Sequence, residues 1–126
     1  MSSLVIDSSA WIDYFEGYGE VKDYIEKSKL KTPTIAIAEI VRVLEKKGKS
    51  KEKIMESVGY IKDISAIPEL DFQHAISGAY LCRSENLDFA DALIYSYATK
   101  EEPLLTTDLD FKDKENAIYI AIRKKK

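Results

Sequence analysis

The chain has 126 residues, a length that fits one domain, and we expect a single domain over residues 1–126. Apolar residues make up 45% of the chain and charged residues 33%, which excludes a disordered or low-complexity polymer. The net charge of −3 argues against a generic basic nucleic-acid binder, and the single cysteine excludes an intramolecular disulfide and a zinc site built from cysteines.

No targeting or membrane signal is visible in the sequence. Apolar runs stay shorter than the ~20 residues that a membrane span needs. The N-terminal residues lack the basic and apolar parts of a signal peptide. A lone cysteine also agrees with a reducing compartment. We therefore expect a cytoplasmic protein that makes no contact with a membrane.

In the first half of the chain, short apolar runs alternate with helical patterns. Strands are predicted at residues 4–6 and from residue 32 to residue 35. A helix after the second strand should end near Gly48. Four helical faces are indicated by apolar residues three or four positions apart: Trp11, Ile12 and Phe15; Val21, Tyr24 and Ile25; Ile40, Val41 and Leu44; and Ile54, Met55, Val58 and Ile61.

In the second half, a weak strand is predicted at residues 64–67 and two clearer strands at residues 104–106 and 118–120. Two helices lie between them, and each has an aspartate at the position of an N-terminal cap, Asp71 or Asp88. Their buried faces are predicted from the helical spacing of Phe72, Ala75, Ile76 and Ala79 in one helix and Phe89, Ala92 and Leu93 in the next.

This alternation of short apolar strands and helices favours a parallel sheet that is covered on both faces. We predict an α/β fold of three layers with four or five strands. In such a sheet the functional crevice lies at the carboxyl ends of the strands.

Five acidic residues stand in apolar surroundings or directly after apolar runs: Asp7, Glu39, Asp91, Asp108 and Asp110. Asp91 is the only charged residue in the segment FADALIYSYA, so it should be partly withdrawn from water. A buried carboxylate costs several kcal/mol unless it is paired, hydrogen-bonded, protonated or bound to a metal. Mg²⁺ and Mn²⁺ prefer such oxygen ligands, so the set as a whole indicates a site for a divalent cation.

Each of these residues also has a simpler interpretation when it is taken alone. Asp7 could cap a helix, Glu39 could pair with Arg42, and Asp91 could form a structural salt bridge. Asp108 and Asp110 could be turn residues after a strand. Because Asp7 and Asp108 both follow predicted strands, where a parallel sheet gathers its sites, the joint pattern favours the metal site.

Four segments carry a family resemblance: DSSAWIDYF, AIAEIVRVL, LDFADALIYSYA and LLTTDLDF. Their order and spacing closely resemble the PIN-domain nucleases, and above all the small VapC-type toxins of prokaryotic toxin–antitoxin pairs. The resemblance extends from Leu4 to about Tyr119. It implies a three-layer α/β/α PIN-like fold, with an acidic pocket that binds Mg²⁺ or Mn²⁺.

The resemblance also implies roles for individual residues. It predicts that the metal ligands are Asp7, Asp91 and Asp108, and that the catalytic set is Asp7, Glu39, Asp91, Asp108 and Asp110. Whether Asp108 or Asp110 lies closer to the metal stays open. Two hydroxyl residues, Ser8 and Thr106, match positions that support the carboxylates.

The function implied by the resemblance is metal-dependent hydrolysis of RNA phosphodiester bonds by an endoribonuclease, leaving 5′-phosphate and 3′-hydroxyl ends. Basic residues at the rim would guide the RNA, with Arg42, Lys46 and Lys47 as candidates. The implied partners are the RNA, a cognate antitoxin protein and a second copy of the chain. Aromatic residues near Trp11, Tyr14 and Phe15 match a region that can line a groove for an antitoxin helix.

Three alternatives remain beside the toxin nuclease. The chain could be a catalytically silent PIN-fold module that binds RNA or protein, or an RNA-maturation nuclease that has no antitoxin. A phosphoacceptor signalling domain also has an acidic Mg²⁺ site on a parallel sheet. That class needs adjacent acidic residues after the first strand, and Asp7 is followed by Ser8 and Ser9.

Overall fold

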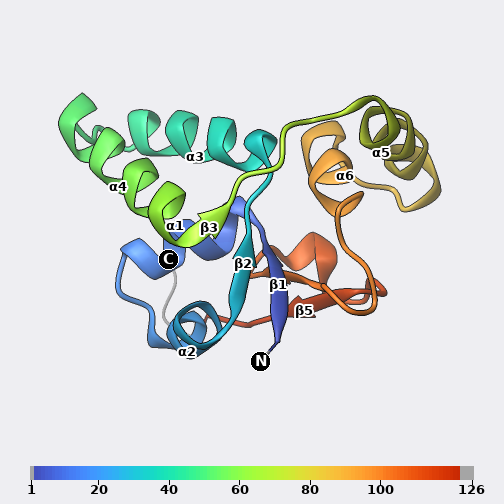
Figure 1. Cartoon of the computed structure of the whole chain (residues 1–126), viewed down its shortest axis with the longest axis horizontal. Coiled ribbons are helices and arrows are strands. Elements are labelled where there is room, and N and C mark those ends of the chain that lie inside the picture. The colour runs from blue at the N-terminus through green and yellow to red at the C-terminus, as the bar shows by residue number, and fades with distance from the viewer. Residues whose placement is uncertain (1, 123–126) are drawn as a thin grey trace.

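Five parallel strands form the centre of the protein in the computed structural model, which describes residues 2–122 (Figure 1). The order across the sheet is β3-β2-β1-β4-β5. The strands are β1 (Ser3–Ile6), β2 (Lys29–Lys31), β3 (Ser65–Ala66), β4 (Leu104–Thr106) and β5 (Ala117–Tyr119). The predicted α/β class and parallel sheet are thereby confirmed, with the higher of the two expected strand numbers.

Within residues 2–122, six α-helices and one short 3₁₀ helix connect the strands. They are α1 (Ser8–Phe15), α2 (Gly19–Lys27), α3 (Thr34–Lys46), α4 (Lys51–Ile64), α5 (Phe72–Ser84), α6 (Phe89–Tyr95) and the 3₁₀ helix η1 (Leu109–Phe111). None of the helices in this part of the chain has the length and apolar character that crossing a membrane requires.

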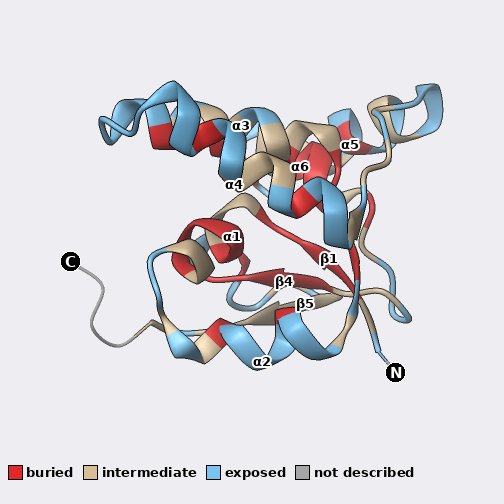
Figure 2. Ribbon diagram, turned by 60° about the vertical axis from the view of Figure 1, so that its left-hand side comes forward, coloured by how far each residue is buried: buried red, intermediate tan, exposed pale blue. Residues whose placement is uncertain are grey.

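The two faces of the sheet bury separate apolar clusters, because neighbouring side chains of a strand point to opposite faces. Leu4 and Ile6 pack with the apolar sides of α1, α2 and α4, whereas Val5 packs with α6 and η1. In β4, Leu105 belongs to the first cluster and Leu104 to the second. Figure 2 shows buried residues along β1, β4 and α1. The three-layer arrangement follows from this alternation.

Several predicted helix ends are confirmed. The carboxylate of Asp71 accepts the backbone N–H of His74 at 2.8 Å and so caps α5. After α3, the backbone of Gly48 has a φ of +83°, a conformation that glycine adopts without steric cost. These local signals predicted the start of α5 and the end of α3.

The second strand was predicted in the wrong place. Residues 32–35 contain β-branched side chains, but Thr34 already begins α3, and Pro33 precedes it with extended dihedral angles. The strand is β2, in which Leu30 is the only apolar residue, between two lysines. Its neighbours β1 and β3 hold it in the sheet through backbone hydrogen bonds. Because backbone pairing does not depend on apolar side chains, the sequence of β2 contains no apolar run that could predict it.

The predicted buried face of α5 is also wrong. Phe72 is 79% exposed and Ile76 is 45% exposed, whereas the buried residue of this helix is Gly78. A Cβ on Gly78 would lie 2.9 Å from the Cα of Leu93, so α5 approaches α6 through its glycine. Apolar spacing identified a stripe on the helix, but spacing does not say whether another element covers the stripe.

Three other residues that were assigned to buried faces are exposed, namely Tyr24, Met55 and Phe89. Each belongs to a helix that also buries apolar residues, such as Ile25 in α2 and Ile54 in α4. Helical neighbours are about 100° apart around the axis, so a residue at the margin of an apolar stripe can face solvent.

Candidate metal centre

Asp7 lies at the carboxyl end of β1, directly after Ile6, and its side chain is buried. It is also the N-cap of α1, because its Oδ1 accepts the Ser8 backbone N–H at 2.9 Å. Its Oδ2 accepts two hydroxyl protons, from Thr106 at 2.7 Å and from Ser9 at 2.9 Å. Asp7 is therefore a helix cap and, in addition, a carboxylate held in a fixed orientation by the end of β4.

Glu39 reaches the same place from the first half of α3. Its Oε1 accepts the Ser8 hydroxyl proton at 3.0 Å. The two hydroxyl residues that were expected to support the site thus do so for different carboxylates: Ser8 bonds Glu39 and Thr106 bonds Asp7. Ser9, which the sequence did not indicate, provides a third hydroxyl at this point.

Asp91 completes the cluster from α6. Oxygen atoms of Asp7, Glu39 and Asp91 all lie within 4.8 Å of one another. These residues are distant in sequence and are brought together by β1, α3 and α6. The central expectation, that separate acidic residues converge at the carboxyl end of the sheet, agrees with this geometry.

A second group of three carboxylates shares Asp91. Oxygen atoms of Asp88, Asp91 and Asp110 also lie within 4.8 Å of one another. Asp88 was predicted only as the cap of α6, and it does hold the N-cap position, but its side chain makes no capping hydrogen bond. The signal that could have identified it is its spacing, because residues three apart in a helix share a face.

Asp108 lies beside these groups and belongs to neither. Its Oδ1 accepts the backbone N–H of Asp110 at 2.9 Å, so it caps η1. Its own backbone N–H donates to the Thr106 hydroxyl at 3.0 Å. Its charge nevertheless acts on the cluster, since it contributes to raising the pKa of both Asp7 and Asp91.

Within the described residues 2–122, the carboxylates of this cluster have no basic partner. Among residues 2–122, no lysine, arginine or histidine forms an ion pair with Asp7, Glu39 or Asp91. The simpler interpretations, in which Glu39 pairs with Arg42 and Asp91 forms a salt bridge, are therefore wrong. Negative charge is concentrated here without a protein cation to compensate it.

The pKa values reflect this concentration. Burial raises the pKa of Asp7 to about 6; hydrogen bonds from Thr106 and Ser9 oppose the rise, and the charges of Glu39 and Asp108 add to it. Burial raises the pKa of Asp91 to about 7, with further contributions from the charges of Asp7 and Glu39. Carboxylate oxygens that are converging, partly buried and free of cationic partners suit Mg²⁺ or Mn²⁺ in ligand type and in charge.

The basic residues expected to bind RNA lie in the second half of α3 and at its C-cap, Lys47. Arg42 is one turn beyond Glu39, and its side chain is exposed. Lys46 is exposed at the end of the helix, about 10 Å from Glu39 along the axis. Lys47 forms an ion pair with Glu16 at 2.7 Å, so part of its charge is compensated within the chain.

Three adjoining cavities lie away from the carboxylates, along α1, α2 and α4. The largest has a volume of about 550 Å³ and is lined by Phe15, Leu44 and Lys53 together with their neighbours. Tyr14 and Phe15 line both of the others. The hydroxyls of Tyr14 and Tyr60 lie 3.0 Å apart at this surface. The region around Tyr14 and Phe15 is therefore hollowed, as well as aromatic.

Comparison with known proteins gives one family and several structures. The sequence model of the PIN domain matches residues 4–117. Among solved structures, the fold is similar to a toxin–antitoxin complex from Klebsiella pneumoniae, with a TM-score of 0.73, 21% identity, and coverage of 92% of this chain and 96% of that one. No curated protein sequence matches the chain.

Two further structures have the same fold at low sequence identity. VapBC2 from Rickettsia felis, bound to a DNA fragment from its promoter, has a TM-score of 0.73 and 14% identity over 94% of this chain and 98% of that one. DNA-bound VapBC from Salmonella typhimurium has a TM-score of 0.68 and 18% identity over 93% and 96%. At these identities the likeness is one of fold.

Proposed function

Because the chain belongs to the PIN domain family, we propose that it is a metal-dependent endoribonuclease and the toxin of a toxin–antitoxin pair. The observation that carries the proposal is the meeting of Asp7, Glu39 and Asp91 within 4.8 Å, with no cationic partner in residues 2–122. Such a cluster is unfavourable in a metal-free protein and becomes favourable once a divalent cation is shared.

The residues that would hold Mg²⁺ or Mn²⁺ are Asp7, Glu39 and Asp91, with Asp110 and Asp88 available to a second ion through Asp91. Asp108, expected as a ligand from the family resemblance, remains a candidate through its effect on the pKa of Asp7 and Asp91. When bound, the cation supplies a water of lowered pKa and stabilises negative charge on the phosphate.

The chain's own hydroxyl groups fix the carboxylates before any ligand arrives. Thr106 and Ser9 both donate to Oδ2 of Asp7, which leaves that carboxylate one orientation. Fixed outer contacts of this kind typically change metal affinity or activity by ~10- to 100-fold. The site is thus preorganised by the end of β4 and the first turn of α1.

Glu39 is suited to orient the attacking water and to accept its proton. Its Oε1 is held by Ser8, and its other carboxylate oxygen has no hydrogen-bond partner among the described residues. A carboxylate beside the reacting phosphate can act as general base when it lies within hydrogen-bond reach of the water. Arg42, exposed one turn further along α3, would attract the RNA backbone, and Lys46 and Lys47 would extend that path.

The toxin assignment adds two protein partners, an antitoxin and a second copy of the chain. Support for an antitoxin comes from the fold shared with three toxin–antitoxin complexes and from the hollow, aromatic surface around Tyr14, Phe15 and Tyr60. A groove of this kind accepts the apolar face of an amphipathic helix. A toxin that cleaves cellular RNA would act in the cytoplasm.

The test is RNA cleavage by the purified full chain in the presence of Mg²⁺ or Mn²⁺ and then of EDTA. We expect Asp7→Asn to lose activity by about 100-fold or more, because charge stabilisation by the cation is worth several kcal/mol. Asp63→Asn, which changes an exposed aspartate on α4, is the matched control and should cleave like the parent chain.

Three results would contradict the proposal or its toxin part. Cleavage that persists in EDTA would exclude the metal mechanism. A parent chain that binds Mn²⁺ but cleaves no RNA, over a wide range of RNA substrates, would instead favour a catalytically silent binding module. Cleavage without any effect of a candidate antitoxin would favour an RNA-maturation nuclease.

A further inference from the structure

Two large apolar side chains are exposed in the segments that carry the second group of carboxylates. Phe89 follows Asp88 at the start of α6 and is 62% exposed. Leu109 directly precedes Asp110 in η1 and is 66% exposed. Exposed apolar residues that stand singly are common on protein surfaces. These two differ, because oxygen atoms of Asp88, Asp91 and Asp110 lie within 4.8 Å of one another and so bring both segments to one edge of the site.

The charges around the site divide its rim into two unlike sides. On α3, Arg42 and Lys46 are exposed and suit the phosphates of an RNA strand. In the segments that contain α6 and η1, from residue 84 to residue 99 and from residue 104 to residue 111, every charged residue is acidic. Such a surface repels phosphates that no cation holds. The part of an RNA strand that fits this side of the rim is therefore an uncharged part, namely a base.

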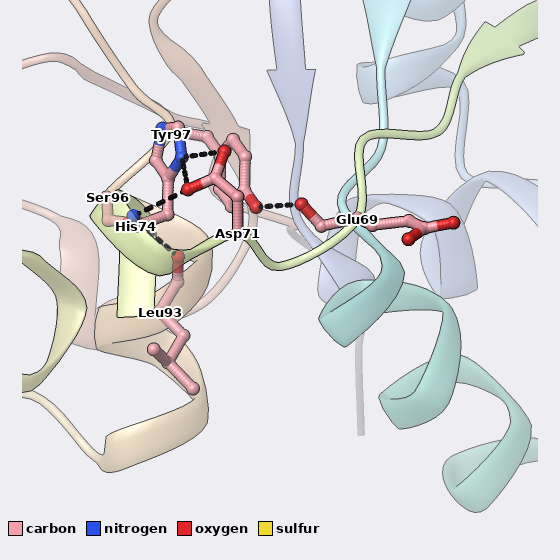
Figure 3. A network of polar contacts seen from close by, with 6 residues as sticks. All are labelled: Glu69, Asp71, His74, Leu93, Ser96 and Tyr97. Carbon is pink, nitrogen blue, oxygen red and sulfur yellow. Dashed lines mark hydrogen bonds and ion pairs between the residues drawn. The ribbon is translucent and has the colours of Figure 1, made fainter. Parts of the chain in front are cut away.

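The helix that carries the exposed phenylalanine is held firmly at its other end. Directly after α6, the Tyr97 hydroxyl donates to the backbone carbonyl of Glu69 at 2.8 Å, and the His74 ring stacks on the Tyr97 ring with centroids 3.8 Å apart (Figure 3). On the side of α5, Gly78 closely approaches Leu93. The aromatic ring at the start of α6 is thus presented by a fixed element, which lowers the entropy cost of binding a ligand there.

We propose that Phe89 stacks on an unpaired base of the RNA strand whose phosphate is held at the carboxylates, and that Leu109 adds apolar contact to that base. Neighbouring helix residues are about 100° apart around the axis, so the Phe89 ring stands beside Asp88 and not over it. A base likewise extends to one side of its phosphate, so the two groups are bound together.

The contact makes a statement about the substrate. A base inside a duplex has its faces covered by its neighbours, so Phe89 selects strands in which a base next to the scissile phosphate is accessible. Because every base has a π-face, the stacking itself is tolerant of sequence. This assignment rests on the proposed nuclease function, and it names the group of the substrate that the acidic side of the rim binds.

The test measures RNA binding by the full chain, through fluorescence anisotropy. Ca²⁺ replaces Mg²⁺, since it takes the same oxygen ligands in a looser geometry, and denaturing gels verify that the RNA stays intact. The probes are a single RNA strand of about 12 nucleotides and a strand of equal length that lacks the bases. Phe89→Ala should weaken binding of the first strand by about 5- to 100-fold, the range typical of removing a stacking residue, and leave binding of the abasic strand unchanged.

A matched control and two conservative changes separate stacking from other causes. Tyr24→Ala removes an exposed aromatic ring on α2, which packs on the opposite face of the sheet from α6, and should bind both strands like the parent chain. Phe89→Trp keeps a stacking face and should bind the first strand at least as tightly as the parent. Phe89→Leu keeps apolar area without the ring and should bind like Phe89→Ala. Leu109→Ala should have a smaller effect than Phe89→Ala.

Two outcomes would overturn the inference: a Phe89→Ala variant that binds the first strand like the parent, and one that loses equal affinity for both strands. The rise in melting temperature on addition of Mn²⁺ is measured for every variant and should be the same as in the parent chain. A parent chain that shows no such rise would instead count against the proposed function, so the two failures are distinguishable.

Discussion

At the carboxyl ends of β1 and β4 the chain gathers acidic side chains and partly buries them, whereas on the outer face of α5 it exposes apolar side chains and keeps charge away from them. Neither arrangement is favourable for the isolated chain, because buried like charges repel and exposed apolar area costs free energy. We propose that each feature is suited to a ligand: a divalent cation for Asp7, Glu39 and Asp91, and an apolar partner for the stripe of Phe72, Ile76 and Tyr80.

The two regions meet in α6, which carries Asp91 on one side and packs against Gly78 of α5 through Leu93. The site is held by hydrogen bonds that aim individual oxygen atoms, and the α5 face is held by close apolar packing on its inner side. Substitutions in the first region should change metal binding and catalysis, and substitutions in the second should change stability.

Among the changes that leave every carboxylate of the site in place, the largest effect is expected from Thr106→Val. This change removes the hydroxyl that donates to Asp7 at 2.7 Å and should raise the Mn²⁺ concentration for half-maximal cleavage by about 10- to 100-fold. Thr107→Val is the control, because that buried hydroxyl donates to Asp13 instead. Equal metal requirements in the two variants would mean that Thr106 does not position Asp7 for the cation.

Next in size is the packing of α5 on α6. Gly78→Ala should lower the free energy of unfolding by about 1–3 kcal/mol, because the new Cβ would lie 2.6 Å from a Leu93 side-chain carbon. Gly59→Ala, inside α4 with open space around it, should instead raise stability by about 0.5–1 kcal/mol. Urea unfolding measures both. If both substitutions raised the free energy of unfolding by similar amounts, α5 would be able to move away from Leu93 at little cost.

The smallest effect is a pH dependence of the metal-free protein. The raised pKa values of Asp7 and Asp91, about 6 and about 7 against 3.8 for the ordinary group, mean that the native state holds protons that the unfolded state has released. Their contribution to stability is present below pH 4 and is lost as the pH rises through 6 and 7.

In EDTA, Asp91→Asn should therefore be more stable than the parent chain above pH 7, and the difference should shrink as the pH falls towards 4. Melting curves at a series of pH values measure it. If the parent chain instead became more stable than Asp91→Asn as the pH rises, some group other than a metal would have to stabilise the Asp91 carboxylate.

Much of the site could be predicted from sequence because its residues follow strong local signals. Asp7 and Thr106 end apolar strands, and Asp91 interrupts an otherwise apolar helix. Asp88 and Ser9 were missed, since an aspartate before a helix and a serine after a strand have ordinary capping roles. Only the fold shows that Asp88 makes no capping bond and that Ser9 reaches Asp7.

The fold was predictable to a similar degree, and its errors share one cause. β2 is defined by its neighbours in the sheet, with Leu30 as its only apolar residue, and the burial of α5 depends on what covers it. Local patterns report the preferences of a segment, whereas these two features depend on contacts between segments that are distant in sequence.

The most direct test of the metal centre is the melting temperature of the EDTA-treated chain as Mn²⁺ is added. At a free Mn²⁺ concentration ~100-fold above Kd, binding to the native state contributes about 2.7 kcal/mol, which corresponds to a rise of roughly 10 °C for a domain of this size. Asp91→Asn, which removes the residue shared by both carboxylate groups, should lose most of this rise, and Asp63→Asn should keep it. A parent chain whose melting temperature does not respond to millimolar Mn²⁺, or an Asp91→Asn variant that responds equally, would contradict the account.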